Sequence, residues 1–315
     1  MKVILLGYSG FIGSHILKEL AKHLKKNAKL NLICVGRNII SQPFQNKKIK
    51  YIKWDFLNFS KSKLFFLKKE NIIINCVGKN YSNNKNLKKI NLIFIKKLTS
   101  YIKNNKILVR LIQLSSVSVY GAEKKYATKI KIITENSQTS PDNLYSKSKL
   151  EAELCIQNIS KINKKHFSFT ILRVANVFSE LQNPNSFRLI NFLLNKCVWF
   201  KCSAQTKYHY IHAKDIATAV FLCILHLKKS RNKVYNVSDD INQSQLHKIY
   251  AMKHKVKLLI IPISLKILKL IIRYIPLPKI IFNFFLTISS QITYNNYKLK
   301  KELNFRCRYS LRNKF

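Results

Sequence analysis

Hydrophobic and polar positions along the chain fall into blocks that predict strands alternating with helices. Val3–Leu6 is an unbroken apolar run that ends at a glycine, and a helical pattern begins at Phe11. Unbroken apolar runs are typical of strands that are buried on both faces of a parallel sheet. Four more such runs predict the next four strands: Leu30–Val35, Ile49–Trp54, Ile72–Val77 and Ile107–Leu114.

Helices are predicted between these strands. One extends from about Asn84 to Asn104, and another opens after Pro141 and reaches about Ile162. Regular alternation of apolar strands and helices predicts the α/β class, with a doubly wound parallel sheet. In such sheets ligands bind at the carboxyl ends of the strands.

Glycines at three-residue spacing join the first strand to the first helix. They permit a tight turn and close backbone approach, and the following helix N-terminus attracts an anion. A lone glycine triplet also fits an ordinary strand–turn–helix, but its place directly after the first strand favours a dinucleotide site. The residues expected at the cofactor here are Gly7, Ser9, Gly10, Phe11, Ile12 and Gly13.

The end of the second strand bears on the choice of cofactor. An acidic residue there would bond the adenosine ribose of NAD, but the chain has Gly36-Arg37. Arg37 can meet a 2′-phosphate, which slightly favours NADP over NAD. The other interpretation is that Arg37 stacks on the adenine or lies in solvent. The further cofactor residues expected are Asp55, as acceptor for an adenine amino group, with Phe56, Cys76, Val77, Gly78 and Asn91.

Tyr145 and Lys149 are four residues apart and share a helix face. A buried ammonium beside a phenol favours the phenolate and lowers a pKa that starts near about 10. Tyr145 could then donate and accept a proton near neutral pH. The spacing is common by chance and also fits an exposed helix face. Its position after the fifth strand, downstream of Ser115-Ser116, favours a catalytic pair.

Composition and charge narrow the classes of protein. The chain has 315 residues, is 47% hydrophobic and carries a formal net charge of +45, which suits one large domain or two joined ones. Of the 58 basic residues, 49 are lysines spread evenly along the chain, beside abundant Asn and Ile. This pattern indicates AT-rich codons rather than a nucleic-acid partner. The charge still attracts anionic cofactors and substrates.

The seven cysteines form no C-x-x-C pair, which predicts free thiols in a reducing cytoplasm. The eight histidines show no metal-ligand spacing, so no metal is expected. No signal peptide precedes the first strand, and a cytoplasmic location is therefore expected.

Several motifs, in order along nearly the whole length, carry a resemblance to a known family. The chain resembles the NAD-dependent epimerase/dehydratase family of extended short-chain dehydrogenase/reductases, and within it nucleotide-sugar 4-epimerases and 4-reductases. The matching segments are Gly7–Gly13, Ser116–Gly121, Tyr145 with Lys149, Leu172–Phe178, Tyr210–Asp215, Tyr235–Ser238 and Lys300–Phe305.

The resemblance implies a Rossmann-like cofactor domain with a smaller C-terminal substrate subdomain, and it implies catalytic roles. Lys149 would hold the nicotinamide ribose, Tyr145 would exchange a proton with the sugar oxygen, and Ser116 would bond that oxygen, with Ser115 as the alternative serine. Hydride would pass between the nicotinamide and a sugar carbon, most often C4. The residues expected at a nucleotide-sugar substrate are Asn176, Phe187, Lys207 and Tyr208.

Departures from the family pattern limit what the resemblance implies. An Arg that often contacts the substrate diphosphate is replaced by Tyr208-His209. Sugar 4,6-dehydratases carry an Asp-Glu pair where this chain has Val117-Ser118, so dehydration is not expected. An epimerase and a 4-keto-sugar reductase both stay open, and Arg37 slightly favours the reductase. Both types occur in cell-surface polysaccharide synthesis. A non-catalytic accessory or redox-sensing member of the family is the alternative.

The expected domains are interleaved. Residues 1–172 and about 212–238 would bind the dinucleotide, and about 173–211 and 239–315 the substrate. A homodimer through helices near 84–104 and 142–163 is the habit of the family.

The C-terminal third contains an apolar stretch, 258–288, which lysines and prolines interrupt, so it is not a spanning helix. Within it, Leu265–Ile275 predicts a helix with Lys266, Lys269 and Arg273 on one stripe and apolar residues on the other. Such a helix either lies on an anionic bilayer, as a peripheral membrane contact, or packs on the core.

Overall fold

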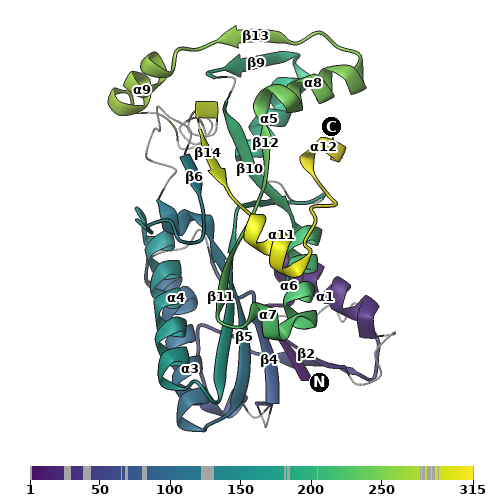
Figure 1. Cartoon of the computed structure of the whole chain (residues 1–315), viewed down its shortest axis with the longest axis vertical. Coiled ribbons are helices and arrows are strands. Elements are labelled where there is room, and N and C mark those ends of the chain that lie inside the picture. The colour runs from purple at the N-terminus through teal and green to yellow at the C-terminus, as the bar shows by residue number, and fades with distance from the viewer. Residues whose placement is uncertain are drawn as a thin grey trace.

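A seven-stranded sheet forms the lower part of the molecule in the computed structural model (Figure 1). The structure describes residues 2–24, 30–37, 44–64, 66–67, 70–79, 84–121, 131–180, 182, 185–203, 205–276, 278, 281, 285, 288–289 and 291–314. The strands of the sheet are β1 (Lys2–Leu6), β2 (Asn31–Gly36), β3 (Ile49–Lys53), β4 (Glu70–Asn75), β5 (Leu108–Ser116), β7 (Phe167–Val174) and β11 (Lys233–Val237).

The strand order is β11-β7-β5-β4-β1-β2-β3, and all neighbouring strands are parallel. The predicted doubly wound parallel sheet is confirmed. Because the chain leaves β1 first toward β2 and then returns to β4, the order reverses between β1 and β4. Ligands of such sheets bind in the crevice at this reversal, beyond the carboxyl ends of the strands.

Helices cover both faces of the sheet, which explains why its strands are apolar throughout. Alternate residues of β1 point to opposite faces. Val3 and Leu5 pack in the core beneath α1 (Phe11–Leu24) and α6 (Ala213–Leu225), while Ile4 and Leu6 pack beneath α3 (Phe94–Asn104) and α4 (Leu144–Ile162). Figure 1 shows the two helix layers on opposite sides of the strands.

The carboxyl ends of two strands differ from the prediction by two residues. Strand β4 ends at Asn75, two residues early, because the Val77 N–H donates to the Asn75 side chain rather than to a neighbouring strand. Strand β5 runs two residues further than predicted, to Ser116, since β7 pairs with it along its whole last half.

The helix predicted over 84–104 is present but interrupted. It comprises α2 (Asn84–Lys88), a π-helical turn over Lys89–Ile93 and α3. Such π-turns are frequent at functional sites, and Asn91 lies in the middle of this one. Helix α4 begins where predicted, because Asn143 and Ser146 form a reciprocal capping box at its N-terminus.

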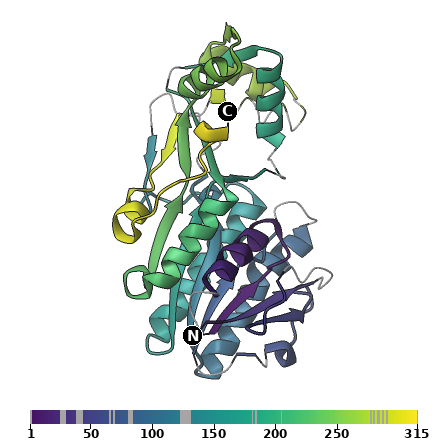
Figure 2. The same ribbon diagram turned by 90° about the vertical axis from the view of Figure 1, so that its right-hand side faces the viewer.

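The upper part of the molecule has its own small sheets and its own apolar core (Figure 2). Its strand groups are β12 (Asp239–Asn242), β10 (Lys207–His212) and β8 (Asn176–Phe178); β13 (Leu259–Pro262) with β9 (Val198–Lys201); and β14 (Ile292–Tyr294) with β6 (Lys131–Ile133). The remaining helices are α5 (Asn185–Asn195), α7 (Leu227–Ser230), α8 (Gln243–His254), α9 (Leu265–Tyr274), α11 (Tyr297–Leu303) and α12 (Leu311–Lys314), with 3-10 turns at Lys61–Leu64 and Val117–Tyr120.

Among the places where the chain crosses between the two parts, three lie near the expected domain limits. Strand β7 passes into β8 at Ala175, β10 passes into α6 after His212, and β11 passes into β12 at Ser238. The domain limits expected at residues 172, 212 and 238 lie close to these crossings, and the division into cofactor and substrate domains stays a prediction. No helix in the described ranges is long and apolar enough to span a membrane.

Candidate active site

The turn between β1 and α1 is built so that only glycine fits. Gly7 has a φ of +82°, and its carbonyl oxygen accepts the Gly10 N–H at 3.0 Å. A Cβ added at Gly13 would lie 2.1 Å from that same oxygen, so the helix packs directly on the turn. The N-terminus of α1 therefore stands at the carboxyl end of β1 with its positive dipole end toward the crevice, a place suited to a phosphate.

The loops that follow β2 and β3 lie beside this turn. A Cβ at Gly36 would lie 2.9 Å from the Tyr8 ring and 3.0 Å from Ser9 Oγ. Arg37 is exposed, and no acidic side chain of the described chain pairs with it. Asp55 follows β3, and its carboxylate accepts from Leu57 N–H and the Asn58 amide, at 3.2 and 3.3 Å.

Phe56 is placed differently from its neighbour Asp55. Its ring is buried with Trp54 and Phe94, at centroid distances of 5.4 and 5.2 Å. Its side chain thus belongs to the core of the lower part, and only its backbone is placed to line a ligand site.

The loop after β4 is held against α4. Burial raises the pKa of the Cys76 thiol, and the Val77 side chain is also buried. Asn91 Oδ1 accepts from Lys79 N at 3.0 Å, and its amide donates to Lys79 O at 3.0 Å and to Ser148 Oγ at 3.1 Å. The Asn91 amide is thus engaged with the protein, and the residue positions the loop.

Lys149 is buried under this loop. Its Nζ donates to Leu114 O at 3.2 Å, and a Cβ at Gly78 would come within 2.9 Å of it, so a larger residue at 78 would press on the ammonium. Burial lowers the pKa of Lys149 to about 8, against the opposing influence of Cys76 and Glu153. Its Nζ lies 5.8 Å from the ring centroid of Tyr145, which is half-buried at the start of α4.

The two serines at the end of β5 have different surroundings. Ser115 is buried, and its hydroxyl donates to the Glu153 carboxylate. Ser116 is half-buried, and its Oγ accepts from Ser118 N at 3.2 Å. The hydroxyl of Ser115 therefore bonds within the core, while that of Ser116, at the strand end, donates to no acceptor among the described residues. This difference favours Ser116 as the serine that meets a ligand.

A buried network behind these residues was not predicted. Arg173 on β7 forms a bidentate ion pair with the Glu153 carboxylate of α4, with Nη2–Oε2 at 2.7 Å. Its guanidinium also donates to the Tyr120 hydroxyl at 2.9 Å. Tyr120 in turn donates to Asn236 Oδ1 at 2.7 Å. The sequence does hold a signal for this network. Glu153 lies four residues after Lys149, so it continues the helix face that carries Tyr145 and Lys149.

The four residues expected at a substrate fall into two groups. Asn176 is exposed at the start of β8, and Lys207 reaches Thr293 Oγ1 at 2.8 Å. The rings of Phe187 and Tyr208 are fully buried in the upper core, against Phe178 and Trp199. The structure therefore argues against substrate contact by these two rings, because their aromatic side chains stabilise the fold of the upper part.

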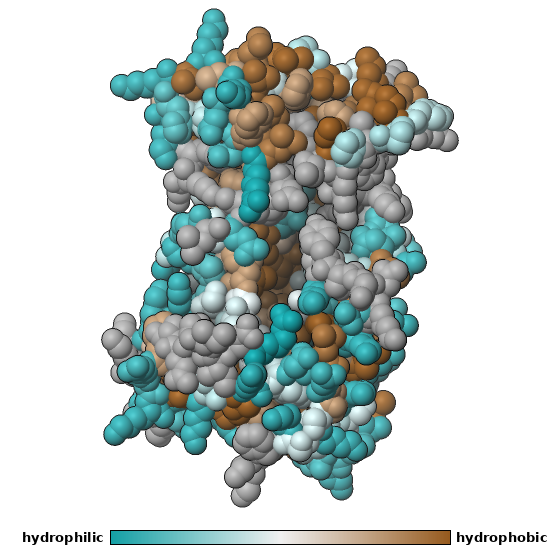
Figure 3. All heavy atoms as spheres, turned by 180° about the vertical axis from the view of Figure 1, so that it is seen from behind, coloured by the Kyte–Doolittle hydropathy of each residue, from teal (hydrophilic) through white to brown (hydrophobic). Residues whose placement is uncertain are grey.

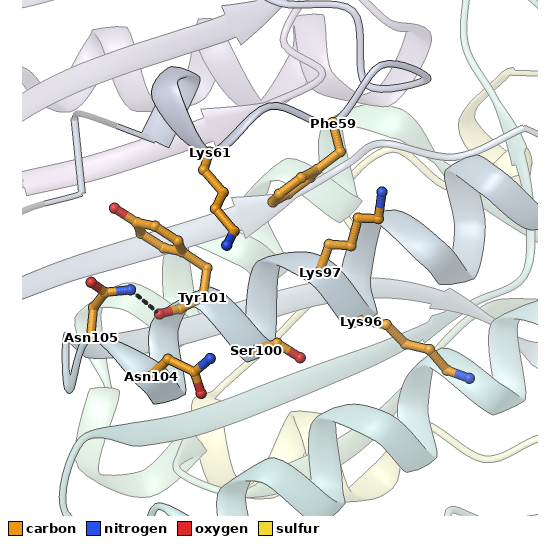
Figure 4. Close-up of a pocket in the computed structure, with 8 residues that line it drawn as sticks. All are labelled: Phe59, Lys61, Lys96, Lys97, Ser100, Tyr101, Asn104 and Asn105. Carbon is orange, nitrogen blue, oxygen red and sulfur yellow. Dashed lines mark hydrogen bonds between the residues drawn. The ribbon is translucent and has the colours of Figure 1, made fainter.

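The molecule is hollowed at mid-height, between its two parts, on the face shown in Figure 3. An open cavity of about 870 Å³ in the upper part is lined by residues that include Lys207, Asp240 and Thr293. A smaller one of about 630 Å³ lies between the segment with Phe59 and Lys61 and the length of α3 (Figure 4). The residues that line it include none of those expected at the cofactor or the substrate. In the described residues no group of three His, Cys, Asp or Glu side chains could hold a metal.

Comparison with known proteins decides the family. Residues 3–238 match the model of the NAD dependent epimerase/dehydratase family. The chain belongs to this family. The predicted resemblance is thereby confirmed, and the glycine turn, Ser116, Tyr145 and Lys149 all lie within the matched segment.

Individual relatives share less than a third of their aligned residues with this chain. A dTDP-D-glucose 4,6-dehydratase of Dictyostelium discoideum is 28% identical over 266 residues, which are 78% of this chain; the chain spans 60% of that relative's length. Among solved structures, a UDP-glucuronic acid 4-epimerase from Bacillus cereus in complex with NAD has a TM-score of 0.70 at 18% identity, covering 99% of this chain and 94% of that one. A UDP-glucose 4-epimerase from Thermotoga maritima with UDP-glucose has a TM-score of 0.68 at 16% identity, covering 99% and 95%. At these identities the structural likeness establishes the shared fold.

Proposed function

We propose that the protein is an NAD(P)-dependent enzyme that oxidises, reduces or epimerises a nucleotide sugar, with C4 as the reacting carbon. The observation that carries the proposal is one arrangement. Lys149 is buried against Gly78 at the end of β4 with Tyr145 on the same helix, and Ser116 ends the adjacent β5. The glycine turn packs on the same end of β4, where the strand order of the sheet reverses. The names of the relatives, 4-epimerases and a 4,6-dehydratase of nucleotide sugars, agree with this substrate class.

The residues present fit a dinucleotide. The turn at Gly7 and Gly13 leaves no room for a Cβ, so backbone N–H groups stand where a pyrophosphate would lie. Arg37 would hold the 2′-phosphate of NADP, and Asp55 would accept from the adenine amino group. NADP is the proposed cofactor, and NAD, which is bound in the Bacillus cereus structure, is the alternative.

The chain's own groups would handle the proton while the bound nicotinamide carries the hydride. Tyr145 exchanges a proton with the oxygen of the reacting sugar carbon. The Lys149 ammonium next to it favours the phenolate and bonds a ribose hydroxyl, and Ser116 donates to the same sugar oxygen as charge develops there. Asn176 and Lys207 would contact the substrate.

Loss of water from the sugar, as in 4,6-dehydratases, is not part of the proposal. The position after Ser116 holds Val117, whose side chain is buried in the core, and then Ser118, so neither residue supplies a carboxyl group. Between the two remaining reactions, the exposed Arg37 favours a reductase that uses NADPH. A role in cell-surface polysaccharide synthesis and a cytoplasmic location belong to this proposal, as does a homodimer through α3 and α4.

The experiment is to follow absorbance at 340 nm after adding NADPH or NADH and a UDP-4-keto-6-deoxysugar. Steady consumption of NADPH supports the reductase. No net consumption, with interconversion of UDP-sugars and dinucleotide already bound to the protein, supports the epimerase. If neither dinucleotide binds, the proposal fails, and a non-catalytic accessory or redox-sensing role takes its place.

A further inference from the structure

Exposed hydrophobic side chains gather on one surface of the upper part of the molecule, which we call the apolar patch. Its members lie on β13, on α9 and directly after α9: Leu259, Ile260, Ile267, Leu270, Tyr274 and Ile275. Each exposes between 48% and 68% of its surface. Figure 3 shows brown spheres gathered along the top of the molecule, where these elements lie. Soluble monomers rarely expose contiguous hydrophobic groups in this way, and such patches mark interaction surfaces.

The local structure explains why the patch is open. Within the described residues β13 pairs only with β9. Its adjacent residues Leu259 and Ile260 point to opposite faces of the strand, and both are exposed. Helix α9 inserts Leu268 into the upper core but leaves Ile267 and Leu270 in solvent. A usual surface helix instead has a polar solvent side.

The charge around the patch points to the kind of partner. No acidic residue occurs between Asp240 and Glu302, while residues 252–281 contain seven basic ones. Lys253, Lys255 and Lys257 are exposed immediately before β13. Basic residues beside exposed apolar groups are the pattern of segments that lie in the surface of an anionic bilayer. A second copy of this chain would instead bring like charges together.

We infer that the apolar patch docks on the surface of an anionic lipid bilayer. Helix α9 has ten residues and is about 15 Å long, so it would lie in the plane of the interface. The apolar side chains would enter the boundary between headgroups and acyl chains, and the lysines would face the lipid phosphates. The inference does not depend on the proposed reaction, because the patch contains none of the residues assigned to cofactor or substrate.

The test is co-sedimentation of the full chain with vesicles of phosphatidylglycerol and phosphatidylcholine, or of phosphatidylcholine alone, at about 0.15 M salt. The variant is Leu270→Gln. Its matched control is Leu225→Gln at the end of α6, since both leucines are 57% exposed and neither change alters the charge. We expect the parent and Leu225→Gln to bind the anionic vesicles equally and Leu270→Gln to bind about tenfold more weakly. Thermal melts check that both variants fold.

Three results would overturn the inference. The parent could fail to bind anionic vesicles. The two variants could bind them equally, which would assign the binding to the net charge of +45 alone. Or Leu270→Gln could change the mass of the protein in analytical ultracentrifugation while vesicle binding stays the same, which would make a second copy the occupant. The 340 nm assay reads the proposed reaction separately.

Discussion

At the scale of single residues, burial of the Lys149 ammonium lowers the stability of the folded chain. The ammonium is buried between Leu114 and Gly78. This burial disfavours its charge, and the pKa of Lys149 falls from 10.5 to about 8. Below pH 8 the lysine is charged in both the folded and the unfolded chain, so folding bears the full cost of burying the cation. Between about pH 8 and 10.5 the unfolded chain binds more protons at this site, and stability due to Lys149 therefore rises with pH.

This argument predicts the pH dependence of the ligand-free protein. Relative to Lys149→Met, the parent should be less stable by on the order of 3 kcal/mol at pH 7.5, and the gap should close by pH 10.5. Urea unfolding of both proteins at several pH values measures the gap and cancels the titration of other groups. A gap that stays constant with pH would contradict the account.

Arg37 carries the prediction about cofactor choice. Removing its guanidinium with Arg37→Ser should weaken NADPH binding by about tenfold or more and leave NADH binding unchanged, because only NADPH has a phosphate for it. Calorimetric titration of both dinucleotides is the measurement. The control is Arg188→Ser, the same change at an exposed arginine that lies on α5. Equal losses for NADPH and NADH would remove Arg37 from this role.

At the scale of elements, the first five strands and the two long helices could be predicted because each has a strong local pattern. Phe187 and Tyr208 could not be placed, since a buried aromatic and a binding aromatic look the same in sequence. The short strands of the upper part, such as β8 and β12, depend on pairing between distant segments and give no local signal. The Glu153–Arg173 pair likewise exists only after α4 packs on β7.

That buried pair ties α4 to the central sheet directly behind the candidate site. Arg173→Met would leave the buried Glu153 carboxylate without its paired guanidinium, and we expect a loss of about 3–5 kcal/mol in the free energy of unfolding. The matched control is Lys22→Met, which breaks the exposed pair with Glu19 and should cost less than about 1 kcal/mol.

The double variant Glu153→Gln with Arg173→Met adds a second check. It should be more stable than Arg173→Met alone, because the orphaned charge is gone. A single variant as stable as the control would show that the pair does not hold α4 in place.

At the scale of the whole molecule, a large parallel sheet and a smaller upper part share a strongly basic chain. The crossings at Ala175, His212 and Ser238 set the upper part over the carboxyl ends of the large sheet. Nucleotide and phosphate groups are anionic, so a net charge of +45 favours their capture in the crevice between the parts. The same charge makes the apolar patch a surface for anionic lipid rather than for another copy.

The central claim, that this chain is an enzyme using Tyr145 as its proton donor and acceptor, is tested most directly by the rate of UDP-sugar conversion in the parent and in Tyr145→Phe. Tyr297→Phe, the same change at an exposed tyrosine on α11, is the control. Chromatography of the sugars and absorbance at 340 nm give the rate, and titration gives the dinucleotide affinity. The account predicts that Tyr145→Phe loses at least about a hundredfold in rate while it keeps its dinucleotide affinity. A parent that binds the dinucleotide but converts no nucleotide sugar, or a Tyr145→Phe variant as fast as the control, would contradict it.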